Sequence, residues 1–166
     1  MGTPTLKANG IGAFVRVRRF PTRLLTACGC WLLGLGLYFI ALRPSLLPED
    51  LRFIGTTADQ IQEHAPGLAR WLKRVFIVTG GFMADAGVLT LFIALSAMPS
   101  RLKGTSPTLA LSGLLTVGLM SASNFALDSD FRWLLLIPAV AWLVGFAGYV
   151  LNRNQPVTQL GANNGL

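Results

Sequence analysis

Four long apolar stretches, separated by charged or proline-containing segments, set the pattern of hydrophobic and polar residues along the chain. They cover residues 24–42, 75–98, 108–127 and 133–151. At a rise of about 1.5 Å per residue, each is long enough as an α-helix to cross a hydrocarbon core of about 30 Å. The sequence therefore predicts an all-α protein, a polytopic membrane four-helix bundle.

The composition agrees with this class. Of the 166 residues, 52% are apolar and only 13% are charged, whereas a soluble domain carries about 25% charged residues. The net charge of +7 would suggest nucleic acid in a soluble protein, but in a membrane protein it more often reflects topology and anionic lipid. We expect the lipid bilayer as a partner and no nucleic acid.

The spans divide the chain into three parts. Residues 1–23 form a basic cytoplasmic tail with five Lys and Arg residues and no acid. A targeting segment has a similar composition, but the apolar stretch that follows is too long for the core of a usual signal peptide. Residues 24–151 form the transmembrane domain, and the polar, glycine-rich residues 152–166 form a flexible tail.

One long connection, residues 44–74, joins the first two spans. Residues 48–50 (PED) place proline and acids at a helix start, and residues 57–60 (TADQ) form a capping box that begins a second short helix. Residues 66–67 (PG) end it. Residues 68–74, with Trp71 among basic residues, are expected to lie at the membrane interface before the chain turns into the second span.

Basic residues favour a topology with both termini in the cytoplasm. The cytoplasmic segments then hold eight of the Lys and Arg residues and the opposite side six, with five of the eight ahead of the first span. The first helix usually dominates orientation. We expect a multi-pass protein of the bacterial inner (plasma) membrane, with the 44–74 loop on the extracytoplasmic side.

Asp85 is the one ionisable residue near the middle of a span. It lies 11 residues after Arg74, about 16 Å along the helix and so near the bilayer midplane. Such residues are costly and usually face a bundle interior. One interpretation is a proton or cation site; the other, which we favour, is a protonated structural Asp that points into the bundle and hydrogen-bonds Thr116 or Trp142 at the same depth.

Small residues suggest where helices approach closely. Gly80, Ala84 and Gly87 share a face of the second span. The fourth span repeats the pattern with Ala141, Gly145 and Gly148. Small residues at this spacing permit close helix packing, and we expect packing within the chain rather than a dimer interface.

The third span carries a polar stripe at helical spacing: Ser112, Thr116, Met120, Ser123 and Asn124. Such a stripe could line a path for an ion or substrate, but such side chains more often bond their own helix or a neighbour.

The sequence offers no catalytic, cofactor-binding or metal-binding set. The two cysteines, Cys28 and Cys30, lie near the cytoplasmic end of the first span, which argues against a thiol-oxidase activity at the opposite face. His64 shares its loop with several acids, but the spacing matches no metal motif.

The first span with its glycines, the loop segment LRPSLLPEDLRFIG and the helix entry RVFIVTGGFMADAG resemble the small four-span bacterial membrane proteins of unknown function. This resemblance implies an extracytoplasmic loop and a glycine pair at the start of the second helix, and it transfers no site residues.

Two functions follow as hypotheses. The favoured one is a non-enzymatic binding, accessory or assembly subunit that associates with another membrane protein or with itself, with its loop as the recognition surface. The alternative is a small oligomeric proton-coupled transporter or channel that uses Asp85.

Overall fold

The computed structural model describes residues 5–153, with side chains described from Phe20 onward. This part of the chain is helical and contains no strand. Its α-helices are α1 (Thr5–Ala41), α2 (Pro48–Ile54), α3 (Ala58–His64), α4 (Leu68–Phe92), α5 (Thr105–Gly113), α6 (Leu119–Ala126) and α7 (Arg132–Arg153). The predicted flexible tail falls almost wholly on residues 154–166, outside the described residues.

Four helical segments are long and apolar enough to cross a membrane: Phe20–Ala41, Leu68–Ala97, Thr105–Ala126 and Arg132–Arg153. The prediction of an all-α, multi-pass membrane protein is therefore confirmed. Helix α1 begins at Thr5, so the basic segment before the first span continues that span as helix.

The second and third spans each contain a π-helical turn that the hydrophobic pattern did not predict. The turn η1 (Ile93–Ala97) extends α4, and η2 (Leu114–Gly118) joins α5 to α6. At the end of η1, the Met98 N–H donates to the Ile93 carbonyl at 2.9 Å, five residues back. A π-turn fits one extra residue into a helical turn and so re-aims the side chains that follow it.

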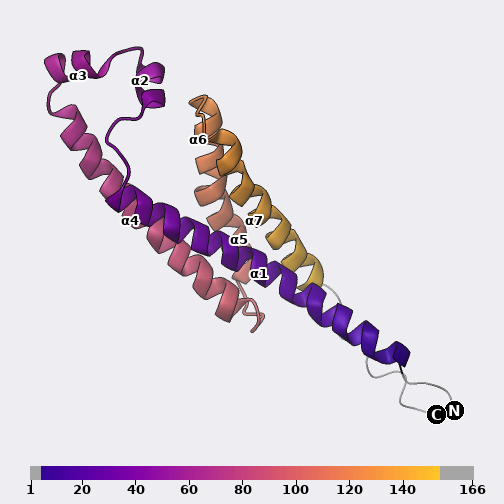
Figure 1. Ribbon diagram of the computed structural model, residues 1–166. Coiled ribbons are helices and arrows are strands. Elements are labelled where there is room, and N and C mark those ends of the chain that lie inside the picture. The colour runs from indigo at the N-terminus through magenta and orange to yellow at the C-terminus, as the bar shows by residue number, and fades with distance from the viewer. Residues whose placement is uncertain (1–4, 154–166) are drawn as a thin grey trace, which may run out of the picture.

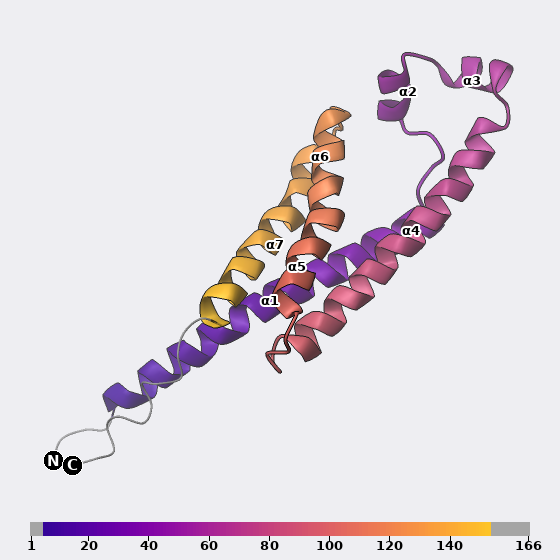
Figure 2. The same ribbon diagram turned by 180° about the vertical axis from the view of Figure 1, so that it is seen from behind.

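Helix α1 is the centre of the arrangement, because it packs against α4 on one side and α7 on the other. The α5–α6 span packs against α7. Figures 1 and 2 show two helix pairs, α1 with α4 and α6 with α7, that diverge toward the end where α2 and α3 lie.

The core lies where the two pairs meet, away from α2 and α3. Leu25 and Leu32 of α1 are fully or almost fully buried there, with Leu109 of α5 and Trp142 of α7. Since all of these side chains belong to one apolar cluster, α1 holds the two pairs together through a continuous hydrophobic contact.

The loop contains the two short helices that its caps predict. Pro48 opens α2, and the Asp50 carboxylate accepts from the Leu47 N–H at 2.8 Å. Thr57 opens α3, and the reciprocal capping-box bonds with Gln60 measure 3.3 and 3.1 Å. These side chains satisfy backbone donors that a helix start leaves free.

The prediction of a turn between residues 68–74 and the second span is wrong. Helix α4 begins at Leu68 and continues without a break to Phe92. Once Gly67 has ended the loop, nothing in residues 68–74 interrupts helical hydrogen bonding, so Trp71 and its basic neighbours form the first turns of the span.

Candidate functional site

The predicted inward orientation of Asp85 is wrong. Asp85 is exposed on the outer face of α4. It makes no hydrogen bond or ion pair with any of the side chains that the structure describes. The inner face of α4 is filled by Gly80, Ala84 and Gly87, and the 100° step of a helix turns Asp85 away from them.

Thr116 and Trp142, the predicted partners of Asp85, bond elsewhere. The Thr116 hydroxyl donates to the Ser112 carbonyl of its own span at 2.7 Å. The Trp142 indole N–H donates to the Leu109 carbonyl at 3.2 Å and so joins α7 to α5. The three predicted site residues therefore do not form one site.

The small-residue face of α4 packs on α1. A Cβ on Gly80 would lie 2.6 Å from the Gly36 carbonyl oxygen, and one on Gly87 would lie 2.5 Å from the Leu33 nitrogen. A Cβ on Gly36 would in turn lie 2.5 Å from the Ala84 nitrogen. Because main-chain atoms of the two helices approach each other this closely, these positions fix the closest approach of α1 and α4.

The small residues of α7 also face α1. A Cβ on Gly145 would lie 3.0 Å from the Leu25 side chain, and one on Gly148 would lie 3.0 Å from Pro21. Ala141 packs against the buried cluster. Both small-residue faces thus serve packing within one chain, and α1 is their common neighbour.

A groove of about 610 Å³ opens between the two helix pairs; we call it the inter-pair groove. Its walls are mostly apolar, with Leu32 and Leu35 on α1 and Met83 on α4. Four residues of the predicted polar stripe line it: Thr116, Met120, Ser123 and Asn124. The Asn124 amide donates to the Met120 carbonyl at 2.8 Å, so part of this stripe bonds its own helix.

Arg43, which sequence reasoning did not single out, lies at the end of the groove nearest α2. Its side chain is only 10% exposed and lies 3.6 Å from the Asp50 carboxylate. Its guanidinium lies 3.5 Å from the centre of the Phe76 ring and 5.0 Å from that of Phe39. Ion pairing and cation–π contact together hold this cation among apolar side chains.

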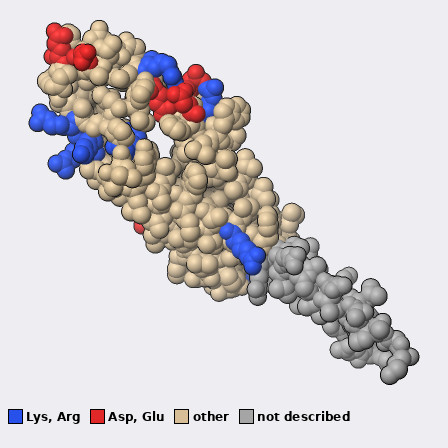
Figure 3. All heavy atoms as spheres, in the orientation of Figure 1, with Lys and Arg blue, Asp and Glu red and all other residues tan. Residues whose placement is uncertain are grey.

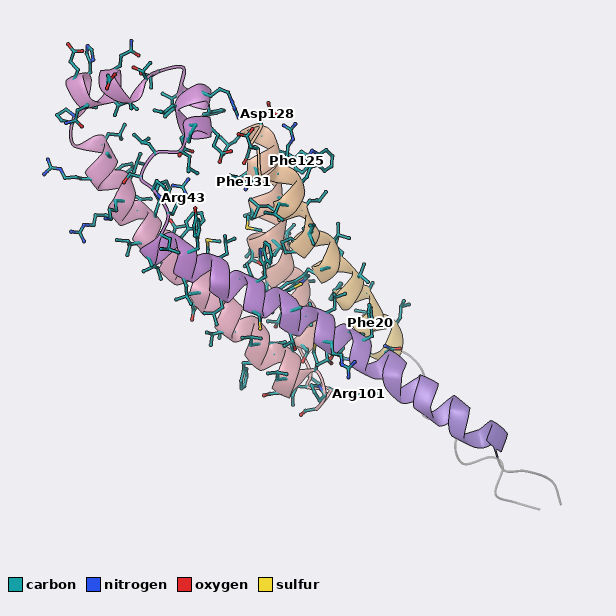
Figure 4. All side chains as sticks on the ribbon, in the orientation of Figure 1. Phe20, Arg43, Arg101, Phe125, Asp128 and Phe131 are labelled. Atoms are coloured by element: carbon teal, nitrogen blue, oxygen red, sulfur yellow. The ribbon has the colours of Figure 1, made fainter. Side chains whose placement is uncertain are left out.

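Helix α2 lies at the open end of the inter-pair groove and is bonded to the hairpin between α6 and α7. One Glu49 oxygen accepts from the Ser129 hydroxyl and from the Asp130 N–H, both at 3.0 Å. Arg52 pairs with Asp130 at 2.9 Å. Figure 4 shows Arg43 on one side of this end, and Asp128 and Phe131 of the hairpin on the other.

The structure also places the two cysteines and the histidine, for which the sequence predicts no activity. Cys28 is buried and donates to the Pro138 carbonyl at 3.7 Å, whereas Cys30 is exposed. His64 contacts the Gln60 carbonyl of its own helix at 3.0 Å. Residues 5–153 hold no group of three or more metal-ligating side chains.

No family model, curated protein or solved structure matches the chain.

Proposed function

We propose that the protein is a non-enzymatic accessory subunit of a membrane complex, and that it docks a partner membrane protein through the outer face of α4. The observation that carries this proposal is the exposure of Asp85 near the middle of a membrane-spanning helix. A carboxylate at the bilayer centre costs about 2.5–3.5 kcal/mol on insertion scales. A partner that covers Asp85 would remove that cost.

The outer face of α4 suits a second helix. Gly81, one turn before Asp85, has no atom within 4 Å of the place where a Cβ would lie, so another backbone can approach there. Val78, Val88 and Phe92 are exposed on the same side. The face therefore offers an apolar strip around a single acid.

The chemistry of Asp85 indicates the kind of partner. A buried carboxylate is best matched by a basic side chain that also donates hydrogen bonds. The Lys and Arg residues of the four spans lie near their ends, at Arg23, Arg70, Lys73, Arg74, Arg132 and Arg153. A second copy of this chain would thus bring no base to the depth of Asp85, so we infer a different protein whose span carries a Lys, Arg or His.

The alternative, a proton-coupled transporter, requires Asp85 beside a polar path. Thr116 and Asn124 line the inter-pair groove, whereas Asp85 is not among the residues that line it. This separation within one chain favours the docking proposal over transport.

Site-directed photo-cross-linking in native membranes tests the proposal. A photoreactive amino acid at Val88 should give a product with one other protein, and one at Leu143, which is also exposed but on α7, should not. Asp85→Leu should weaken the association by about three- to thirtyfold, equivalent to about 0.6–2 kcal/mol. Asp85→Glu should retain it, and removing the basic residue from the span of the captured protein should mimic Asp85→Leu.

Three outcomes would contradict this proposal. They are a product with the mass of two copies of this chain, adducts with lipid alone, and a cross-link that persists unchanged in Asp85→Leu. The first would revive an oligomeric transporter in which Asp85 faces a shared axis.

A further inference from the structure

A second cavity, of about 490 Å³, lies at the end of the bundle opposite α2 and α3. It is formed by the start of the first span, the residues that follow η1 and the last turn of α7. Three arginines line it, Arg23, Arg101 and Arg153, and we call it the basic pocket. Figure 4 shows Arg101 at this end, beside α1 and near Phe20.

Among the described residues that line it, the basic pocket contains no carboxylate to balance these cations. The chain has seven acids, and none of them lines the pocket. The three ion pairs among the described side chains are Arg43–Asp50, Arg52–Asp130 and Arg132–Asp128, and all involve other arginines. Figure 3 shows the red acidic atoms gathered mainly at the α2 and α3 end.

With respect to the described residues, the arginines keep most of their donors free. Arg153 donates to the Ser106 hydroxyl at 3.0 Å, which orients its guanidinium at the pocket. Arg23 and Arg101 are exposed. A guanidinium presents five N–H donors in a fixed fork that matches phosphate oxygens, so three of them around one cavity form a strong anion-binding environment.

Tyr149 gives a second, independent indication of a ligand. Its side chain lines the basic pocket and is only 7% exposed. Its hydroxyl is buried and has no hydrogen-bond partner among the described residues. Buried polar groups are almost always satisfied, so an orphan hydroxyl beside three cations marks a place where an acceptor belongs.

We propose that the basic pocket binds the phosphate of an anionic phospholipid, with the three arginines and the Tyr149 hydroxyl as donors. The pocket lies at the end of the membrane-spanning segments, where head groups lie, and basic pockets between transmembrane helices suit anionic head groups. Met98, Pro21 and Pro99 add an apolar wall against which the first carbons of the acyl chains can pack. The site is separate from Asp85 and does not depend on the docking proposal.

Lipid binding to the purified full chain, measured by native mass spectrometry, tests this inference. The probes are dioleoyl phosphatidylglycerol, dioleoyl phosphatidylcholine and inorganic phosphate. We expect phosphatidylglycerol to bind about tenfold more tightly than phosphatidylcholine, because charge-assisted hydrogen bonds to the phosphate of a zwitterionic lipid compete with its own cation. Millimolar inorganic phosphate should not displace it.

Two variants keep the test independent of folding defects. Tyr149→Phe removes only the orphan hydroxyl, and Arg101→Gln changes an exposed loop residue. Both variants should therefore fold and insert into the membrane as the parent protein does. Each should reduce phosphatidylglycerol binding by about five- to tenfold. Arg74→Gln, at the opposite end of the bundle, is the matched control and should leave binding unchanged.

Equal binding of the two lipids, or unchanged binding in both pocket variants, would overturn the proposal. Displacement by inorganic phosphate would show that the pocket takes free phosphate groups rather than lipid. An equal loss of phosphatidylglycerol binding in Arg74→Gln and Arg101→Gln would show that binding depends on general surface charge, and it would contradict the proposal.

Discussion

Gly36 is one of the residues at which α1 and α4 come closest. A Cβ on it would lie 2.5 Å from the Ala84 nitrogen and 2.6 Å from the Gly80 carbonyl oxygen. These atoms belong to the backbone, so no rotamer change can make room for a methyl group. Gly34, two residues earlier on the same helix, has no atom within 4 Å of its Cβ position.

We therefore expect opposite effects from one chemical change. Gly36→Ala should force α1 and α4 apart and destabilise the fold by about 1–3 kcal/mol, as overpacking does. Gly34→Ala should be neutral, or stabilising by up to about 1 kcal/mol through helix propensity. Denaturant titration of the purified protein in detergent micelles measures both. Equal losses in the two variants would contradict the close contact at Gly36.

Helix α2 links the two helix pairs. It follows α1 in the chain, yet Glu49 and Arg52 bond the hairpin between α6 and α7. Ser129, one of the Glu49 partners, is 3% exposed. Its hydroxyl accepts from the Phe131 N–H at 3.2 Å and donates to Glu49. Helix α2 therefore links the two pairs at the open end of the inter-pair groove.

Removing the Glu49 carboxylate should weaken the attachment of α2 to the hairpin. In Glu49→Ala the bonds from Ser129 and Asp130 are lost, and a hydrogen bond to a charged group contributes about 1.5–3 kcal/mol. Amide hydrogen exchange in residues 48–54 should then quicken by about tenfold or more, while exchange in α3 changes little.

Asp59→Ala is the control, because Asp59 is exposed on α3 and takes no part in the bonds between α2 and the hairpin. If the amides of α2 exchange equally fast in the parent and in Glu49→Ala, the bonds to Glu49 do not restrain α2.

At the scale of the whole molecule, the acidic residues are concentrated at one end of the bundle. Six of the seven acids lie in the α2–α3 loop or the α6–α7 hairpin, and Asp85 lies between the ends. The opposite end carries Arg23, Arg101, Lys103 and Arg153 without an acid. Counted with the four basic residues at positions 7–19 ahead of the first span, this side holds eight of the 14 Lys and Arg residues and the other side six. Because Lys and Arg accumulate on the cytoplasmic side of membrane proteins, we predict a cytoplasmic position for the basic pocket.

Cysteine labelling of intact cells tests that orientation. In a variant with both native cysteines changed to alanine, Asp59→Cys should react with a membrane-impermeant thiol reagent and Lys103→Cys should not. Both positions are exposed, so access to the reagent depends on the side of the membrane. Labelling of Lys103→Cys alone would invert the proposed topology.

The sequence by itself determined the features that depend on neighbouring residues. Span length follows from the apolar stretches, the start of α2 from Pro48 and its acids, and the start of α3 from the capping box at Thr57. Each of these rests on contacts within one helical turn or on the length of one segment. Such contacts can be read along the chain, although the second span begins at Leu68 and not at residue 75 as the apolar pattern predicts.

Only the tertiary structure decided which way each helix face points. Asp85 and Gly81 lie outside because α1 packs on the opposite side of α4. The basic pocket forms because packing brings together Arg23, Arg101 and Tyr149, which lie in three segments far apart in the sequence. The π-turns also re-aim the side chains of two spans. Rotation about a helix axis and the choice of neighbour depend on how all the spans pack together, and no single span carries that information.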